Sequence, residues 1–149
     1  MHRSLILALP LLVAGCLGPP IPEDELPLTV IAQGQMSMQR EMRLEWVTEP
    51  DAFESLWEKT QTGPRPAVDF EREGVIAVFM GQQPTGGHSI RVDRAMRADD
   101  ELMVEVVLQS PGEGCITTQA LTQPYQMVSV PQVAEQASFS TRTVLVPCD

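Results

Sequence analysis

The pattern of apolar and polar residues along this chain predicts a protein built mostly of β-strands. Residues 75–80 are all apolar, in a run that is too short for a buried helix and rich in β-forming types. Such a run indicates a strand that is buried on both faces. Residues 88–92 alternate in polarity, which predicts a second strand with one buried face. Pro84, Gly86 and Gly87 lie between the two, so we expect a β-hairpin with a rigid loop at its tip.

Other segments add strands and one helix. Further strands are expected at residues 28–32, 36–47, 102–108, 125–130 and 139–146. Phe53, Leu56 and Trp57 have the spacing of one apolar helix face. Thr48, three residues before Asp51, resembles a capping box at the start of that helix. The expected fold class is mainly β (α+β): an antiparallel β sandwich or curled sheet of six to eight strands with one short packed helix.

Three methionines form a stripe in the expected strand at residues 36–47. Met36, Met38 and Met42 are separated by polar residues. Thioethers are ligands for copper, but a metal site needs convergent ligands. We therefore expect these side chains to pack in the core, where methionine fills irregular gaps.

The start of the chain predicts export. Residues 1–15 have the short basic and apolar regions of a signal peptide and are too short to span a bilayer. Residues 13–16 resemble the lipobox of bacterial lipoproteins, in which cleavage precedes a cysteine that carries lipid. That resemblance implies a protein of the cell envelope, anchored in the lipid bilayer through acylated Cys16. The residue after it, Leu17, implies the outer membrane if the cell has two. An ordinary signal peptide with a chance cysteine is the alternative.

The remaining chain divides into a tether and one domain. Residues 16–27 hold the expected lipidated cysteine and a proline-rich, solvated spacer. Residues 28–149 are long enough for a single domain with one core. A formal net charge of −10 argues against nucleic acid as a partner, because phosphate contacts need clustered lysine and arginine.

The residues able to do chemistry are few. Cys115 and Cys148 remain after Cys16, and an even pair in an exported protein favours a disulfide. The alternative, a nucleophilic cysteine, needs an activating base. His88 is the one histidine after cleavage, and its neighbour Ser89 points to the opposite strand face, so the two cannot form a dyad. We therefore expect no enzyme activity, no metal and no cofactor.

Several segments resemble one known family. The resemblance is carried by residues 69–70, 75–81, 84–90, 110–112 and 118–125. Together these are similar to the pattern of the PrcB family, which is named for a subunit of a surface protease complex. The resemblance implies a non-catalytic lipoprotein that assists or stabilises an envelope protein such as a protease.

The expected partner-binding residues lie in two loops. They are Pro84, Thr85, Gly86, Gly87, His88, Ser89, Pro111 and Gly112. Loops with paired glycines can approach a partner's backbone closely. Equally, Gly86 and Gly87 can serve only to permit the turn, and the sequence leaves both interpretations open.

A second resemblance offers an alternative function. Residues 83–87 are similar to the Asn-Pro-Thr-Thr-Gly loop of chagasin-type cysteine-peptidase inhibitors. This resemblance implies a peptidase inhibitor that uses the loop around Pro84. The tryptophan-bearing loop of those inhibitors has no counterpart in this chain.

Lipidation at Cys16 can be tested directly. We expect Cys16→Ala to leave an unprocessed precursor, because the thiol that accepts the lipid is gone, and to yield no mature form in the detergent phase. Phase partitioning and the mass of the product measure both effects. A variant that is processed and partitions like the wild type would contradict the lipoprotein assignment.

Overall fold

The structure is a computed structural model that describes residues 24–60 and 63–148. The expected signal peptide, Cys16 and most of the tether lie outside the described residues. Within them the elements follow in the order β1 (Thr29–Gly34), β2 (Arg43–Val47), α1 (Pro50–Trp57), β3 (Glu73–Phe79), β4 (Ser89–Ala98), β5 (Glu101–Pro111), β6 (Tyr125–Pro131) and β7 (Gln136–Val146).

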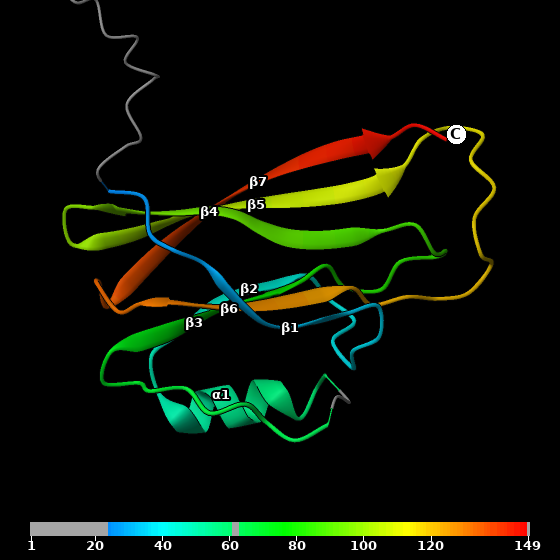
Figure 1. Cartoon of the computed structure of the whole chain (residues 1–149). Coiled ribbons are helices and arrows are strands. Elements are labelled where there is room, and N and C mark those ends of the chain that lie inside the picture. The colour runs from blue at the N-terminus through cyan, green and yellow to red at the C-terminus, as the bar shows by residue number, and fades with distance from the viewer. Residues whose placement is uncertain (1–23, 61–62, 149) are drawn as a thin grey trace, which may run out of the picture.

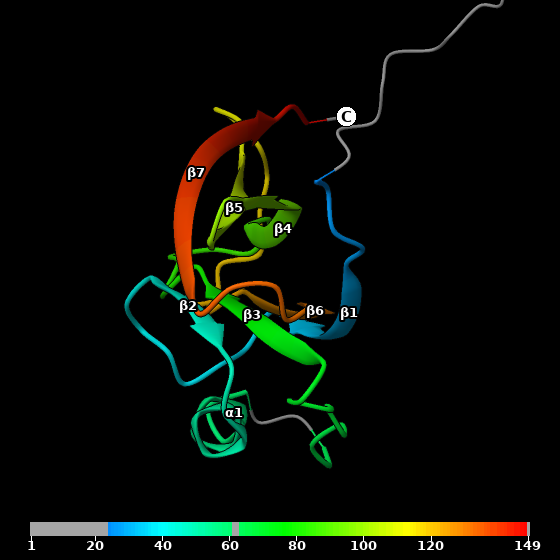
Figure 2. The same ribbon diagram turned by 90° about the vertical axis from the view of Figure 1, so that its left-hand side faces the viewer.

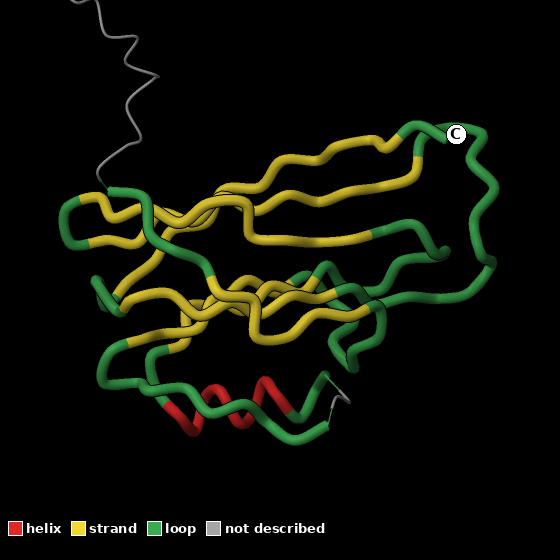
Figure 3. Tube along the Cα trace, in the orientation of Figure 1, coloured by secondary structure: helices red, strands yellow, loops and turns green. Residues whose placement is uncertain are grey.

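The described elements form three layers. A four-stranded sheet has the order β1-β6-β3-β2, and a three-stranded sheet has the order β4-β5-β7. The two sheets pack face to face, and α1 covers the outer face of the four-stranded sheet (Figures 1 and 2). Strands dominate the trace in Figure 3. The mainly β fold class with one short packed helix is confirmed, although the pairing of β5 with β7 is parallel.

The apolar run at residues 75–80 occupies the centre of the molecule, as predicted. β3 pairs with β2 on one edge and with β6 on the other. Ile76 and Val78 pack between the two sheets, whereas Val75, Ala77 and Phe79 pack toward α1. All five side chains are fully buried. The strand is therefore covered on both faces, which explains its lack of polar alternation.

The predicted hairpin of β3 and β4 is wrong. β3 lies in the four-stranded sheet and β4 in the three-stranded sheet. Both edges of β3 are occupied by strands that are distant in sequence, so β4 has no edge to pair with. Residues 80–88 instead form a crossing segment that carries the chain from one layer to the next (Figure 1).

The core position predicted for the methionine stripe is also wrong. Met36, Met38 and Met42 are 56%, 54% and 53% exposed, and β2 begins only at Arg43. Residues 35–42 link β1 and β2, which lie at opposite edges of the sheet. Because this connection is not part of a sheet, its alternating apolar side chains have no buried sheet face to pack against. The buried residue in this connection is Ser37.

The helix forms where predicted but begins differently. Phe53 and Leu56 are buried on its apolar face, which confirms that interpretation. The N-cap is Glu49 rather than Thr48, and no side chain caps the helix, so the predicted capping box is wrong. Pro50 at the first position lacks an N–H group, so one fewer donor needs a cap.

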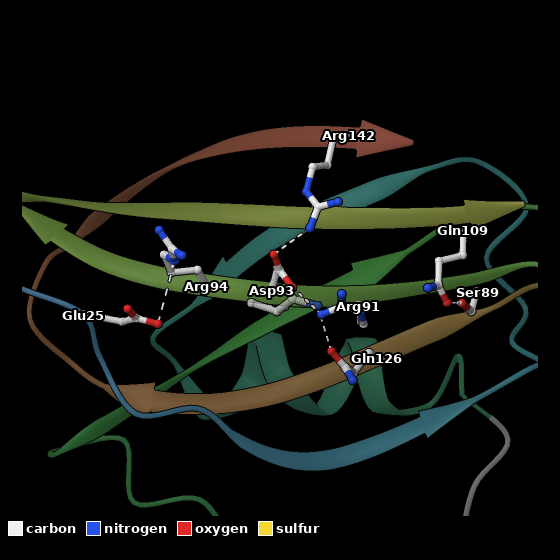
Figure 4. Close-up of polar contacts among 9 residues, drawn as sticks. Glu25, Ser89, Arg91, Asp93, Arg94, Gln109, Gln126 and Arg142 are labelled. Carbon is white, nitrogen blue, oxygen red and sulfur yellow. Dashed lines mark hydrogen bonds and ion pairs between the residues drawn. The ribbon is translucent and has the colours of Figure 1, made fainter. Parts of the chain in front are cut away.

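One buried amide joins the two sheets across the core. The backbone N–H of Val92 donates to Oε1 of Gln126 at 2.8 Å, and Nε2 of Gln126 donates to Gln33 at 3.2 Å. The register of β4 shifts between Val92 and Arg94, so its ladder is interrupted at this point. Because a buried N–H without a partner is costly, Gln126 stabilises this irregular part of β4 (Figure 4).

The first described residues, before β1, are hydrogen-bonded to β4. The N–H of Leu26 donates to the carbonyl of Ala95 at 2.8 Å, and the N–H of Arg97 donates to the carbonyl of Asp24 at 2.9 Å. The start of the described chain is thereby attached near the end of β4 that leads into the turn to β5.

A close contact at the start of β3 gives a stability prediction. A Cβ on Gly74 would lie 2.2 Å from the Trp46 ring, whose Nε1 donates to the carbonyl of Ala134 at 3.0 Å. We expect Gly74→Ala to lower the free energy of unfolding by about 1–3 kcal/mol, because the indole must leave its position. Gly63→Ala is the matched control, since nothing lies within 4 Å of that Cβ. Equal stability of the two variants by chemical denaturation would contradict the contact.

Candidate functional site

The crossing segment at residues 80–88 is held by the long segment that follows β5. Gln83 and Thr122 exchange backbone hydrogen bonds of 2.8 and 3.1 Å. The Thr122 hydroxyl donates to the carbonyl of Thr85 at 2.8 Å, and the N–H of Gly86 donates to the carbonyl of Thr118 at 2.9 Å. The loop is therefore packed against residues 118–122 rather than standing free as a hairpin tip.

Three of the residues that were predicted to bind a partner, Thr85, Gly86 and Gly87, instead take part in this packing. The Thr85 hydroxyl donates to the carbonyl of Gly86 at 3.0 Å. A Cβ on Gly86 would approach the Cβ of Thr118 to 3.3 Å, and Gly87 has a φ of +83°. Gly86 thus permits a close approach and Gly87 a left-handed backbone. Both glycines have the architectural role that was one of the two interpretations.

Two of the predicted loop residues meet at the rim of a groove. Gly87 lies beside Pro111, with 3.5 Å between the Cβ that would be built on the glycine and the proline ring. The groove encloses about 480 Å³ and is lined by Gly87, Pro111, Gly114, Cys115, Ile116, Thr117, Val146, Pro147 and Cys148. Ile116 is fully exposed to solvent, at 102%. The two predicted loops and the C-terminal segment therefore converge on a largely apolar surface.

A disulfide closes one side of this groove. Cys115 and Cys148 are bonded, with their Cα atoms 5.4 Å apart. The predicted pairing is confirmed, and it attaches the segment after β5 to the residues after β7. The N–H of Gly112 also donates to the carbonyl of Val146 at 2.8 Å. The wall formed by residues 146–148 is thus fixed to the loop at residues 112–115.

His88 and Ser89 do not act together. The Ser89 hydroxyl donates to Oε1 of Gln109 on β5 at 2.8 Å. The Nδ1 atom of His88 is buried and has no hydrogen-bond partner among the described residues, so it does not bond to the Ser89 hydroxyl. Pro84 is exposed within the crossing segment, and Gly112 lies behind the groove wall.

A charged cluster on the outer face of the three-stranded sheet was not predicted. Asp93 on β4 forms ion pairs with Arg91 on the same strand and with Arg142 on β7, the latter at 2.9 Å (Figure 4). The hydrogen bond from Arg142 lowers the pKa of Asp93, against the opposing effect of burial. Because β5 lies between β4 and β7, this cluster holds the two outer strands of the sheet together.

Two further observations concern the described residues only. No helix among them is long and apolar enough to span a bilayer. No group of three histidine, cysteine or carboxylate side chains gathers there in a way that could hold a metal ion.

The fold and the groove define a two-sheet β domain with an apolar surface at one end. Residues 75–131 match the family described as PrcB C-terminal. This match supports the assignment of that region to the PrcB family. It runs from β3 to β6 and includes the groove residues from Gly87 to Thr117. No curated protein matches the chain significantly, and neither does any solved structure.

Sequence reasoning missed the residue that most defines the groove. Ile116 stands alone in a turn-rich, polar segment, so no periodicity marks it. Val146 was recognised only as part of a strand. A single apolar residue in a loop can be buried or exposed, and only the path of the chain decides which.

The disulfide leads to a chemical prediction. We expect alkylation of denatured mature protein to label neither Cys115 nor Cys148 until reductant is added, as measured by mass. We also expect the double Cys→Ser variant to lose at most about 4 kcal/mol of unfolding free energy, as chain entropy gives for a loop closed over a separation of 33 residues. Free thiols in protein purified from the cell envelope would show that the bond does not form there.

Proposed function

We propose that this protein is a non-catalytic binding module of a lipid-anchored envelope protein, and that its groove binds a partner protein. The module assists or stabilises that partner, for which a protease is the leading candidate. The match of residues 75–131 to the PrcB C-terminal family supports this proposal, because that family is named for a subunit of a protease complex.

The convergence of two loops and a fully exposed isoleucine carries the proposal. Burial of apolar surface stabilises an association by about 25 cal/mol per Å². Ile116 gives the isolated domain no stabilisation from apolar burial, since its side chain is entirely in water. A partner that covers Ile116 and the adjoining disulfide would gain that energy without distorting the domain.

The lining of the groove supports binding rather than catalysis. None of its nine residues has a side chain that titrates, because its two cysteines are bonded to each other. General acid–base chemistry needs such a group within hydrogen-bond reach of a substrate. The groove offers apolar contact and backbone groups instead.

The position of the groove suits a tethered protein. The described chain begins beside Arg97, at the end of β4 remote from Gly87. Ten residues of β4 at about 3.3 Å each separate the two by roughly 30 Å. A lipid on Cys16 would therefore hold the domain by one end and leave the groove at the other end accessible to a partner (Figure 1).

The alternative, a peptidase inhibitor acting through the loop around Pro84, receives less support from the geometry. The carbonyl of Thr85 and the N–H of Gly86 are already bonded to Thr122 and Thr118. A loop that inserts into a peptidase needs such groups free. An inhibition assay against papain-type peptidases separates this function from the proposed one.

The groove is tested by a matched pair of variants. Ile116 and Leu121 are both exposed on the same segment, but only Ile116 lines the groove. We expect Ile116→Asp to reduce recovery of the partner from envelope extract at least about tenfold, because a carboxylate would be desolvated in the contact. We expect Leu121→Asp to leave recovery unchanged.

The measurement is quantitative co-purification of one partner, first identified with the wild type. Both variants should unfold within about 0.5 kcal/mol of the wild type, since both sites are exposed. Equal recovery with the two variants would contradict a partner site in the groove. Inhibition of a peptidase that Ile116→Asp does not affect would favour the alternative function.

A further inference from the structure

The edges of the two sheets differ in how they are protected. β1 has six residues, and its register with β6 shifts between Val30 and Ala32. β4 has a similar shift, and residues 24–26 bond to it along the far edge. β2 has five residues, and Trp46 on it bonds to the segment before β7. Short strands, bulges and covering segments are the usual ways to prevent pairing with another chain.

Within residues 24–60 and 63–148, β7 has none of these protections. It has eleven residues, and its register with β5 runs without a shift from Gln136 to Val146. Among the described residues no strand pairs with its other edge. No proline interrupts it, and its one charged side chain, Arg142, is paired with Asp93. It therefore presents a long, regular row of backbone groups along the side of the domain.

The side chains of β7 also remain open on the side of the sandwich core. Phe139 packs against the core between the sheets. Thr141, Thr143 and Leu145 lie on the same side of the strand but are exposed, Leu145 at 63%. Figure 2 shows β7 as the outermost strand, curving away from the four-stranded sheet. These side chains have cross-strand neighbours on β5, but none of the described strands supplies neighbours on their other side.

We propose that β7 accepts an extended strand from the partner, which lengthens the three-stranded sheet. Strand addition to an exposed edge gains affinity from backbone hydrogen bonds and specificity from alternate side chains. The segment it fits has apolar residues at alternate positions, which would pack beside Thr141, Thr143 and Leu145. This inference rests on the proposed function, because it names the chemistry of the partner's segment.

Charge selects the occupant of this edge. The whole chain has a formal net charge of −10, so two copies repel each other. A segment flanked by lysine or arginine is attracted to a protein of this net charge, and one flanked by aspartate or glutamate is repelled. The expected occupant is therefore a basic-flanked strand of another protein and not a second copy of this chain.

The probe is a synthetic peptide of alternating valine and threonine with a lysine at each end. We expect it to protect the amides of β7 from hydrogen exchange and to leave those of β1 unchanged. A peptide methylated on alternate backbone nitrogens should give no protection, because it cannot complete the ladder. A peptide with glutamate at both ends should bind about tenfold more weakly.

Thr143→Asp on β7 tests the site, and Thr29→Asp on β1 is its control, since both change one exposed threonine on an edge strand. We expect Thr143→Asp to weaken binding of the lysine-flanked peptide at least about tenfold, because the carboxylate would be buried beside the added strand. Simple charge attraction predicts the opposite result. Thr29→Asp should not weaken binding.

Three outcomes would overturn the inference. The first is that the lysine-flanked peptide does not protect the β7 amides from hydrogen exchange, or that the methylated peptide protects them equally. The second is self-association of the wild type, measured by light scattering, that Thr143→Asp abolishes, because a second copy would then occupy the edge. The third is full partner recovery with Thr143→Asp when Ile116→Asp loses it. That last result would leave the groove proposal intact and refute strand addition.

Discussion

The burial of the four-stranded sheet on both faces is the constraint on which the rest of the structure depends. β3 and β6 at its centre carry apolar side chains alternately toward the three-stranded sheet and toward α1. A sheet with two apolar faces cannot stand in water, so it needs a cover on each side. The three-layer arrangement follows from this requirement. The helix is short, and its stability comes from packing Phe53 and Leu56 on the sheet.

The crossing segment and the groove are consequences of that arrangement. The chain must leave β3 for the other sheet, and residues 80–88 make this passage. Their backbone groups are satisfied by Thr118 and Thr122, which lie between β5 and β6. The segment that supplies these bonds also carries Ile116 and Cys115 to the same end of the sandwich. The surface proposed for binding is thus formed by the connections between layers.

The difference in size between the sheets leaves one side open. The longest strands, β5 and β7, pair with each other over eleven residues, whereas β2 at the corresponding edge of the other sheet has five. β7 therefore extends beyond the cover that the four-stranded sheet provides. β5 pairs with β7 along its whole length and Arg142 links β7 to β4 through Asp93, whereas no described strand pairs with the far edge of β7. An ordered strand with a free edge is suited to accept another strand, because little conformational entropy is lost on binding.

The sequence by itself determined the strands, the helix and the cysteine pair. Residues 75–80 predicted a doubly buried strand because local composition reports burial, and the spacing of Phe53 and Leu56 predicted the helix because periodicity reports its face. Tertiary structure decided which strands pair, so the predicted hairpin of β3 and β4 failed even though each strand was correct. It also decided that the alternating methionines, in a connection between sheet edges, would point to solvent. Pairing partners and exposed loop residues such as Ile116 depend on contacts between segments far apart in the chain, and no local pattern encodes those contacts.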